Sequence, residues 1–261
     1  MKISQSFVKE YSKYKQKRAC GLQVKAKYVD GVVFPSSGVM NAGNYFEFMA
    51  TGCLPRSGEI PTPEMVYKGT AKEKLSTDYE RANASAEYFK KVIEHYKIEI
   101  LETGKVITID NRTGILDIVA KFNNRLCVID LKYSGLLDDK WNEMGWETES
   151  LPYKDNLMIQ AVHYTILLAE VCEVDYTDID FYFFVFDSKN SNNAKIVKVN
   201  IDPDAFESHL QVVDKVYEEV VLNNHNFRAY PSLKLCENCP IAKDCKHKLE
   251  VPNIEEIYYT I

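Results

Sequence analysis

Hydrophobic and polar positions alternate most regularly in residues 114–135, whose sequence is GILDIVAKFNNRLCVIDLKYSG. Two apolar runs rich in Ile, Val and Leu flank the pair Asn123 and Asn124, which predicts two strands joined by a tight two-residue turn. With that turn, Phe122 pairs with Arg125, and the register of the hairpin follows from this pair.

The same register brings charged positions together on one face of the hairpin. Counting back from the turn places Asp117 directly opposite Asp130, and such pairs have Cβ atoms about 5 Å apart. Side chains alternate faces along a strand, so Lys132 points the same way as Asp130. Three ionisable groups are therefore expected on a face whose other residues are mostly apolar.

Apolar periodicity elsewhere predicts the remaining elements. Helices are expected at 4–19, 44–52, 70–96, 156–171 and 202–223, and further strands at 97–110, 178–187 and 194–201. Residues 21–43 are expected to be irregular or extended, and the three prolines of 53–63 predict a loop. This order of elements predicts an α/β fold in which helices flank a mixed central sheet.

Two carboxylates as close as Asp117 and Asp130 repel each other, and partial burial raises that cost. A divalent cation such as Mg²⁺ or Mn²⁺ relieves the repulsion, because carboxylate oxygens are the ligands it prefers. Lys132 adds a positive charge suited to a developing anion or to orienting a water molecule. The alternative is a surface face with an ordinary ion pair, and the hairpin alone does not decide between the two.

The helix expected at 156–171 carries two polar residues that bear on this choice. Gln160 and Tyr164 are four residues apart, so they lie on one face of the helix. The helix is mostly apolar and is expected to be largely buried. A buried amide and phenol need polar partners, which a phosphate or water at a metal site would supply.

The composition is that of a globular intracellular protein. The chain has 261 residues, of which 46% are hydrophobic, enough for one large domain. Its basic start lacks the apolar segment of a signal peptide, and the longest apolar run, 181–186, is too short to span a bilayer. A soluble cytoplasmic protein is therefore expected.

The net charge of −6 disfavours a polyanionic partner, but the charge is unevenly distributed. Residues 1–30 hold eight Lys or Arg against two acids, and residues 228–248 hold five against two. Basic ends on an acidic chain are typical of a nucleic-acid surface, although a solvated helical face gives the same pattern. The candidates for DNA contacts near the start of the chain are Lys13, Lys17, Arg18 and Lys25.

Three cysteines near the end of the chain are spaced Cys-x2-Cys-x5-Cys: Cys236, Cys239 and Cys245. Thiols this close in a cytosolic chain predict ligation of iron or zinc rather than disulfides. A tetrahedral centre needs a fourth ligand, for which the candidates are Cys20, Cys53 and His247. Cys20 is favoured, because joining it to the tail would bring the two basic segments together.

In order and spacing, these motifs resemble the PD-(D/E)XK nuclease superfamily, and within it the RecB-like iron–sulfur branch of AddB-type nucleases and CRISPR-associated RecB-like exonucleases. The family signature is Gly-x-x-Asp, then Asp/Glu-x-Lys, then Gln-x-x-x-Tyr, with one cysteine before these motifs and three after. GILD, DLK and QAVHY match the three motifs. The resemblance spans nearly the whole chain. It implies a restriction-endonuclease-like core and a [4Fe–4S] cluster on Cys20, Cys236, Cys239 and Cys245.

The chain departs from the family at one position. The relatives usually carry a metal-binding His, often followed by Glu, in the helix before the first strand, where this chain has Phe46 and Glu47. Glu47 is expected to take over as the ligand. The implied Mg²⁺ or Mn²⁺ site then consists of Glu47, Asp117, Asp130 and a backbone carbonyl of Ile129 or Leu131. Lys132, Gln160 and Tyr164 are the further catalytic residues that the resemblance implies.

The resemblance implies a Mg²⁺- or Mn²⁺-dependent deoxyribonuclease, an exonuclease acting on single-stranded or frayed DNA ends in recombination, repair or phage DNA processing. Residues 1–261 are expected to form one nuclease domain. Within it, 1–60 and 225–261 would form a subdomain clipped by the cluster around a nuclease core at 95–224. Two alternatives from other classes are a non-catalytic DNA-binding module on a nuclease fold and a structural zinc protein.

Overall fold

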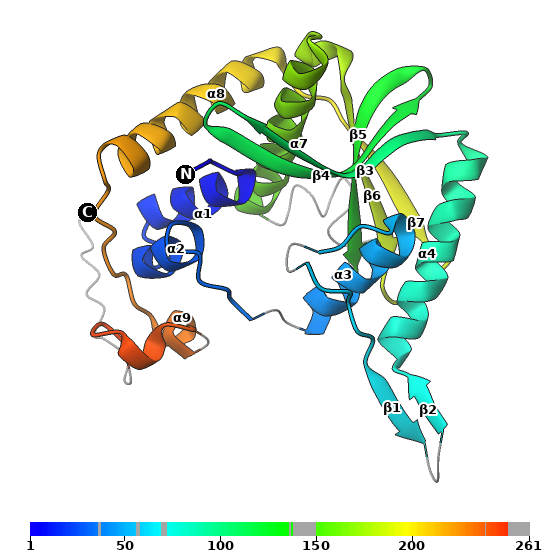
Figure 1. Cartoon of the computed structure of the whole chain (residues 1–261), viewed down its shortest axis with the longest axis horizontal. Helices are drawn as coiled ribbons and strands as arrows, with labels where there is room; N and C mark the ends of the chain where they lie inside the picture. Colours follow the sequence, from blue (N-terminus) through cyan, green and yellow to red (C-terminus); the bar gives the residue numbers. More distant parts are fainter. Residues whose placement is uncertain are drawn as a thin grey trace, which may run out of the picture. The chain divides into compact units, whose positions relative to one another are not determined.

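The computed structural model of the chain describes residues 1–35, 38–55, 58–68, 72–135, 137, 150–237 and 239–249 (Figure 1). The chain divides into two compact units. The terminal unit comprises Met1, Ile3–Pro35 and Val213–Ile261, and the core unit comprises Lys2 and Ser36–Val212. In the part described, no helix is both long and apolar enough to cross a membrane.

A five-stranded mixed sheet forms the centre of the core unit. Its strands lie in the order β3-β4-β5-β6-β7, and all neighbours are antiparallel except β5 and β6, which are parallel. The strands are β3 (Glu99–Ile109), β4 (Arg112–Phe122), β5 (Arg125–Ser134), β6 (Asp180–Asp187) and β7 (Ala194–Val199). The mixed sheet predicted from the sequence is confirmed.

The turn between β4 and β5 forms as its sequence predicts. Phe122 pairs with Arg125 across the two residues of the turn. Asn123 and Asn124 have φ angles of 51° and 61°. These lie in the left-handed region, which a two-residue hairpin turn needs and asparagine tolerates.

Helices cover both faces of the sheet, as Figure 1 shows. The helices are α3 (Gly38–Thr51) and α4 (Thr77–His95) on one face and α7 (Ser150–Cys172) on the other. In β6, Phe184 and Phe186 belong to the core under α3 and α4, whereas Phe181 and Phe183 belong to the core under α7. A strand buried on both faces is apolar at successive positions, which explains the uninterrupted run that begins at Phe181.

The helix α8 (Pro203–Tyr217) begins in the core unit and packs on α7. Phe206 contacts the side chains of Val162 and Ile166. Deeper in the same contact, His163 Nδ1 lies 2.9 Å from His209 Nε2. Burial lowers the pKa of both rings, to about 4 and about 3 respectively, so both are neutral near pH 7.

Several helix boundaries differ from those predicted. The helix expected at 70–96 begins only at Thr77, where the Ser76 carbonyl accepts the first hydrogen bonds and acidic residues favour the positive end of the helix dipole. Ahead of it stands a hairpin of β1 (Met65–Lys68) and β2 (Lys72–Leu75) (Figure 1). The prediction of an irregular or extended segment at 21–43 is wrong for α2 (Gly21–Tyr28) and for the first six residues of α3, whereas residues 29–35 are irregular as predicted.

The terminal unit joins segments from both ends of the chain. In the residues described, it contains α1 (Gln5–Lys15), α2, the end of α8, a π-helix at Glu218–Leu222, α9 (Leu233–Glu237) and a 3-10 turn at Ala242–Asp244. The Tyr14 hydroxyl accepts a hydrogen bond from the Arg228 backbone N–H at 3.1 Å, and Gln23 donates to the Leu235 carbonyl at 2.7 Å. Gly21 is needed at this contact, because a Cβ there would lie 2.4 Å from the Arg228 carbonyl oxygen.

Candidate functional site

The two carboxylates of the β4–β5 hairpin lie side by side. Ile118 pairs with Ile129, and continuing that register by one residue places Asp117 opposite Asp130. The Leu131 backbone N–H donates a hydrogen bond to Asp117 Oδ2 at 2.8 Å. This bond holds the Asp117 carboxylate against β5, as the strand pattern predicts.

Asp130 is almost fully buried and has two polar partners. Its side chain is 1% exposed. Lys132 Nζ forms an ion pair with Asp130 Oδ2, and Gln160 Nε2 donates a hydrogen bond to Asp130 Oδ1. Gln160 comes from α7, so the helix and the hairpin meet at this carboxylate. The structure thus brings four of the predicted site residues together.

The charges of this cluster act strongly on one another. Burial raises the pKa of Asp117 well above its usual value, and the nearby carboxylates of Asp130 and Glu47 raise it further. Burial also raises the pKa of Asp130, against the opposing effects of Lys132 and Gln160. Burial alone would lower the pKa of Lys132, but Asp130 and Asp117 raise it, so the ammonium stays charged.

Tyr164 and Gly114 explain how α7 comes so close to the hairpin. Tyr164 is buried, 3% exposed, and its ring lies against β4. A Cβ at Gly114 would lie 2.7 Å from Leu167 Cδ1 and 3.0 Å from Tyr164 Cε1. The glycine three residues before Asp117 is therefore needed for the approach of α7. The sequence pattern contained this glycine, but only the packing gives it a role.

Phe46 stands where the relatives' histidine is expected, and it belongs to the hydrophobic core. It is 1% exposed and stacks on Tyr133 of β5, with ring centroids 5.0 Å apart. The next residue of α3, Glu47, lies close enough to Asp117 to affect its pKa. Glu47 is thus the acidic group that α3 brings to the cluster.

The oxygen donors of the cluster fit a divalent cation. Mg²⁺ commonly binds to one or two carboxylates and completes its shell with water and substrate phosphate. Asp117 and Asp130 supply two carboxylates whose mutual repulsion a cation would reduce. Across the described residues, however, no group of three or more His, Cys, Asp or Glu side chains is arranged to hold a metal by itself. The assignments of Glu47 and the Leu131 carbonyl as ligands stay predictions.

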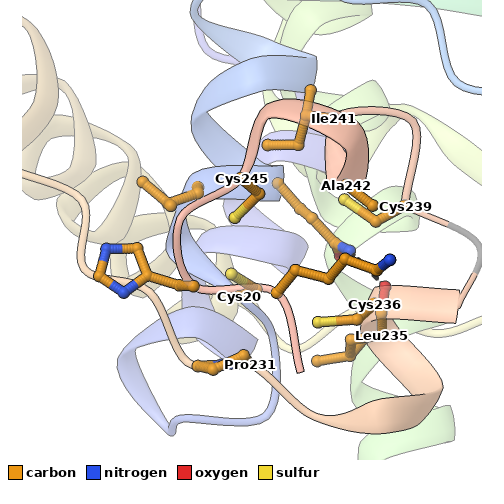
Figure 2. A pocket seen from close by; sticks show the side chains of 12 residues that line it. Cys20, Pro231, Leu235, Cys236, Cys239, Ile241, Ala242 and Cys245 are labelled. Carbon is orange, nitrogen blue, oxygen red and sulfur yellow. Dashed lines mark hydrogen bonds between the residues drawn. The ribbon is translucent and has the colours of Figure 1, made fainter. Parts of the chain in front are cut away.

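Four cysteines line one pocket of the terminal unit (Figure 2). Cys20 precedes the first turn of α2, and the other three are Cys236, Cys239 and Cys245. His247 lines the same pocket, whereas Cys53 belongs to the core unit. Thiols are the usual ligands of iron–sulfur centres and zinc, so the residue types suit such a group, but the described side chains are not arranged as a group of three or more that could hold a metal. Its presence stays a prediction.

The four basic residues predicted to contact DNA belong to the terminal unit. Lys13 forms an ion pair with Glu10 at 2.8 Å, and Lys25 forms one with Asp30 at 2.7 Å. Lys17 and Arg18 are exposed after the end of α1. Two of the four charges are therefore partly compensated within the unit, and a DNA-binding role stays a prediction for all four.

The model of the PD-(D/E)XK nuclease superfamily matches residues 59–246, more than two thirds of the chain. The fold is similar to the crystal structure of a protein from Eubacterium rectale that is provisionally described as an exonuclease: the TM-score is 0.65 at 15% identity, over 97% of this chain and 91% of that one. SSO0001 aligns over 61% of this chain and 66% of its own at 15% identity, with a TM-score of only 0.31. No curated protein matches the sequence.

Proposed function

The chain belongs to the PD-(D/E)XK nuclease superfamily, and on that premise we propose that it is a metal-dependent deoxyribonuclease that degrades single-stranded or frayed DNA from a free end. The observation that carries this proposal is the cluster of Asp117, Asp130, Lys132 and Gln160. A protein that only binds DNA has no need of two adjacent carboxylates, which repel phosphate. Their repulsion destabilises the folded chain, and a bound cation would offset that repulsion.

Asp117 and Asp130 would hold Mg²⁺ or Mn²⁺, with Glu47 and the Leu131 carbonyl completing the set. When bound, the cation supplies Lewis-acid polarisation of the scissile phosphate and lowers the pKa of water. The Leu131 N–H fixes the orientation of the Asp117 carboxylate for this role, and Gln160 does the same for Asp130. The protein therefore contributes preoriented oxygen atoms.

Lys132 would orient the attacking water and stabilise the negative charge that builds on the phosphate. Its Nζ lies beside Asp130 Oδ2, and the two carboxylates keep it protonated. Tyr164 lies close enough to Lys132 to affect its pKa. Tyr164 and Gln160 would thus position Lys132 and the DNA backbone from α7.

In the terminal unit, Cys20, Cys236, Cys239 and Cys245 would hold a [4Fe–4S] cluster. The proposal is supported by the pocket that the four line and by the resemblance to iron–sulfur nucleases. The hydrogen bond from Gln23 to Leu235 already holds the two chain segments together next to Cys236. The cluster would therefore fasten the two ends of the chain, a structural role rather than a redox one.

The preference for free ends can be tested by comparing linear with circular single-stranded DNA of equal length in Mn²⁺. Basic segments at both chain ends suit the binding of a threaded single strand through its phosphates. We expect faster degradation of the linear form and a steep loss of activity as salt rises, because counterion release drives binding. Equal rates on the two forms would contradict threading, while a complete lack of cleavage would contradict the nuclease proposal itself.

Replacing Glu47 with alanine should raise the Mn²⁺ concentration needed for half-maximal cleavage by about tenfold or more. The reason is the loss of the one acid that α3 brings to the Asp117 cluster. The measurement is a Mn²⁺ titration of the cleavage rate, beside a thermal melt.

Glu94→Ala changes an exposed residue of α4 and is the matched control. It should alter neither the Mn²⁺ concentration needed for cleavage nor the melting temperature. If Glu47→Ala lowers the melting temperature but leaves the Mn²⁺ dependence of cleavage unchanged, Glu47 has a structural role.

A further inference from the structure

A polar pocket in the core unit lies between α3, α4 and the segment before β1, outside the carboxylate cluster. Polar groups line it from three segments: Asn41 and Asn44 from α3, Glu59 and Thr62 from the loop, and Tyr79 from α4. Its volume is about 260 Å³, just below the roughly 300–1,000 Å³ of sites for drug-sized ligands. A single nucleobase is small enough to enter it.

The pocket and the carboxylate cluster share the helix α3. Asn44 precedes Glu47 by three residues, so the two lie less than one turn apart on the helix, whose pitch is about 5.4 Å. Asn41 precedes Asn44 by the same spacing, so the two amides are neighbours on the helix surface. Glu47 in turn acts on the Asp117 carboxylate. A strand with its scissile phosphate at Asp117 would thus have an adjacent nucleotide within reach of the pocket.

The charges around the pocket select the kind of group that can enter. Glu59 lines it, and burial together with the carboxylates of Glu64 and Asp78 raises the pKa of Tyr79 on its wall. This negative surrounding disfavours a phosphate and favours groups that donate hydrogen bonds. The exocyclic amino groups of adenine, cytosine and guanine each carry two N–H donors, whereas thymine offers only its ring N3–H. Asparagine can pair with adenine through two hydrogen bonds, and a carboxylate accepts from the amino group of cytosine.

We propose that this pocket binds one nucleobase of the substrate strand beside the scissile phosphate, and that it prefers bases with an exocyclic amino group to thymine. The inference rests on the proposed nuclease function and deepens it by giving the site a base specificity. Pro55 and Pro61 line the pocket, and the ring of each proline fixes its own φ angle.

The first test compares cleavage of oligo-dA, oligo-dC and oligo-dT of one length by the wild type and by Asn41→Ala and Asn44→Ala. The wild type should have a lower KM for the dA and dC substrates than for dT. Loss of a paired amide should reduce this preference by about fivefold or more, mainly through KM. Asn192→Ala, an exposed asparagine between β6 and β7, is the matched control and should keep the wild-type preference.

The second test measures binding without cleavage, by NMR titration with dCMP, dTMP and 2-deoxyribose 5-phosphate in Mg²⁺. We expect dCMP to bind most tightly, and Asn44→Ala to reduce its affinity to that of the base-free sugar phosphate. Equal affinities for all three ligands, or a dCMP affinity unchanged in both asparagine variants, would overturn the proposal. If Asn44→Ala lowers the melting temperature, the dCMP affinity of Asn41→Ala tests the proposal instead, because the Asn41 side chain is exposed and its replacement should not destabilise the fold.

The two tests separate this inference from the proposed function. Cleavage without base preference by the wild type would support the proposed nuclease function and contradict the proposed base pocket. Absence of cleavage would contradict the proposed nuclease function. The dCMP and dTMP titrations would still decide whether the pocket recognises a base.

Discussion

An Asp130→Ala protein is expected to lose DNA cleavage by at least about 100-fold while its melting temperature without metal stays the same or rises. Asp130 is the most buried member of the cluster and contacts both Lys132 and Gln160. Its removal takes away one of the two hairpin carboxylates and the acceptor that positions Lys132. Cleavage should therefore fail even in excess Mn²⁺.

The stability expectation follows from the direction of the pKa shift. The pKa of Asp130 is raised in the folded chain, chiefly by burial. A carboxyl whose pKa is higher in the folded than in the unfolded chain opposes folding wherever it is ionised, which includes neutral pH. Removing it also relieves the repulsion of Asp117. Thermal melts at pH 7 in EDTA measure this contribution.

Lys132→Ala should abolish cleavage to a similar degree but have the opposite effect on stability. Without Lys132, Asp117 and Asp130 lose the cation that offsets their repulsion, so the melting temperature in EDTA should fall. Asp204→Asn, an exposed change at the start of α8, is the control for both variants. Cleavage at the wild-type rate by either variant would show that the hairpin is not part of the active site.

Cys20→Ala is expected to lose the visible absorbance and the iron of the proposed cluster and to unfold at a lower temperature than the wild type. Cys20 is more than two hundred residues from Cys236 in sequence, so a cluster bound to both closes a very long loop. Binding free energy of such a group contributes to folding free energy. Each kcal/mol lost should lower the melting temperature by roughly 2–4 °C in a chain of this size.

The controls for Cys20→Ala separate the possible ligands and metals. Cys172→Ala, at an exposed thiol at the end of α7, should keep full iron content. Cys53→Ala and His247→Ala test the alternative fourth ligands. Iron retained in Cys20→Ala and lost in either of these would contradict the assignment of Cys20. Zinc in place of iron in protein purified without oxygen would contradict the iron–sulfur cluster.

The hairpin could be predicted because its signals are local. The pair Asn123 and Asn124 specifies the turn, and the turn fixes the register that places Asp117 beside Asp130. The apolar run of β6 likewise indicates a strand buried on both faces. The contact of Gln160 with Asp130 follows from its place on α7 only once the packing of that helix is known.

Other features depend on contacts distant in sequence and could not be predicted. α2 forms where an irregular segment was expected, and it is held by contacts such as that of Gln23 with Leu235. The helix expected from residue 70 starts at Thr77, because β1 pairs with β2 ahead of it. The role of Gly114 appears only when Tyr164 and Leu167 are seen to pack on it.

The most direct measurement of the central claim is degradation of an end-labelled linear single-stranded DNA by the purified protein in Mn²⁺ and in EDTA, with Asp130→Asn prepared in parallel. Asparagine keeps the shape of Asp130 and an acceptor for Gln160 but removes the negative charge that a cation needs. The account predicts shortened products with the wild type in Mn²⁺, and none in EDTA or with Asp130→Asn. Equal cleavage in all three conditions, or no cleavage by the wild type in Mn²⁺, would contradict it.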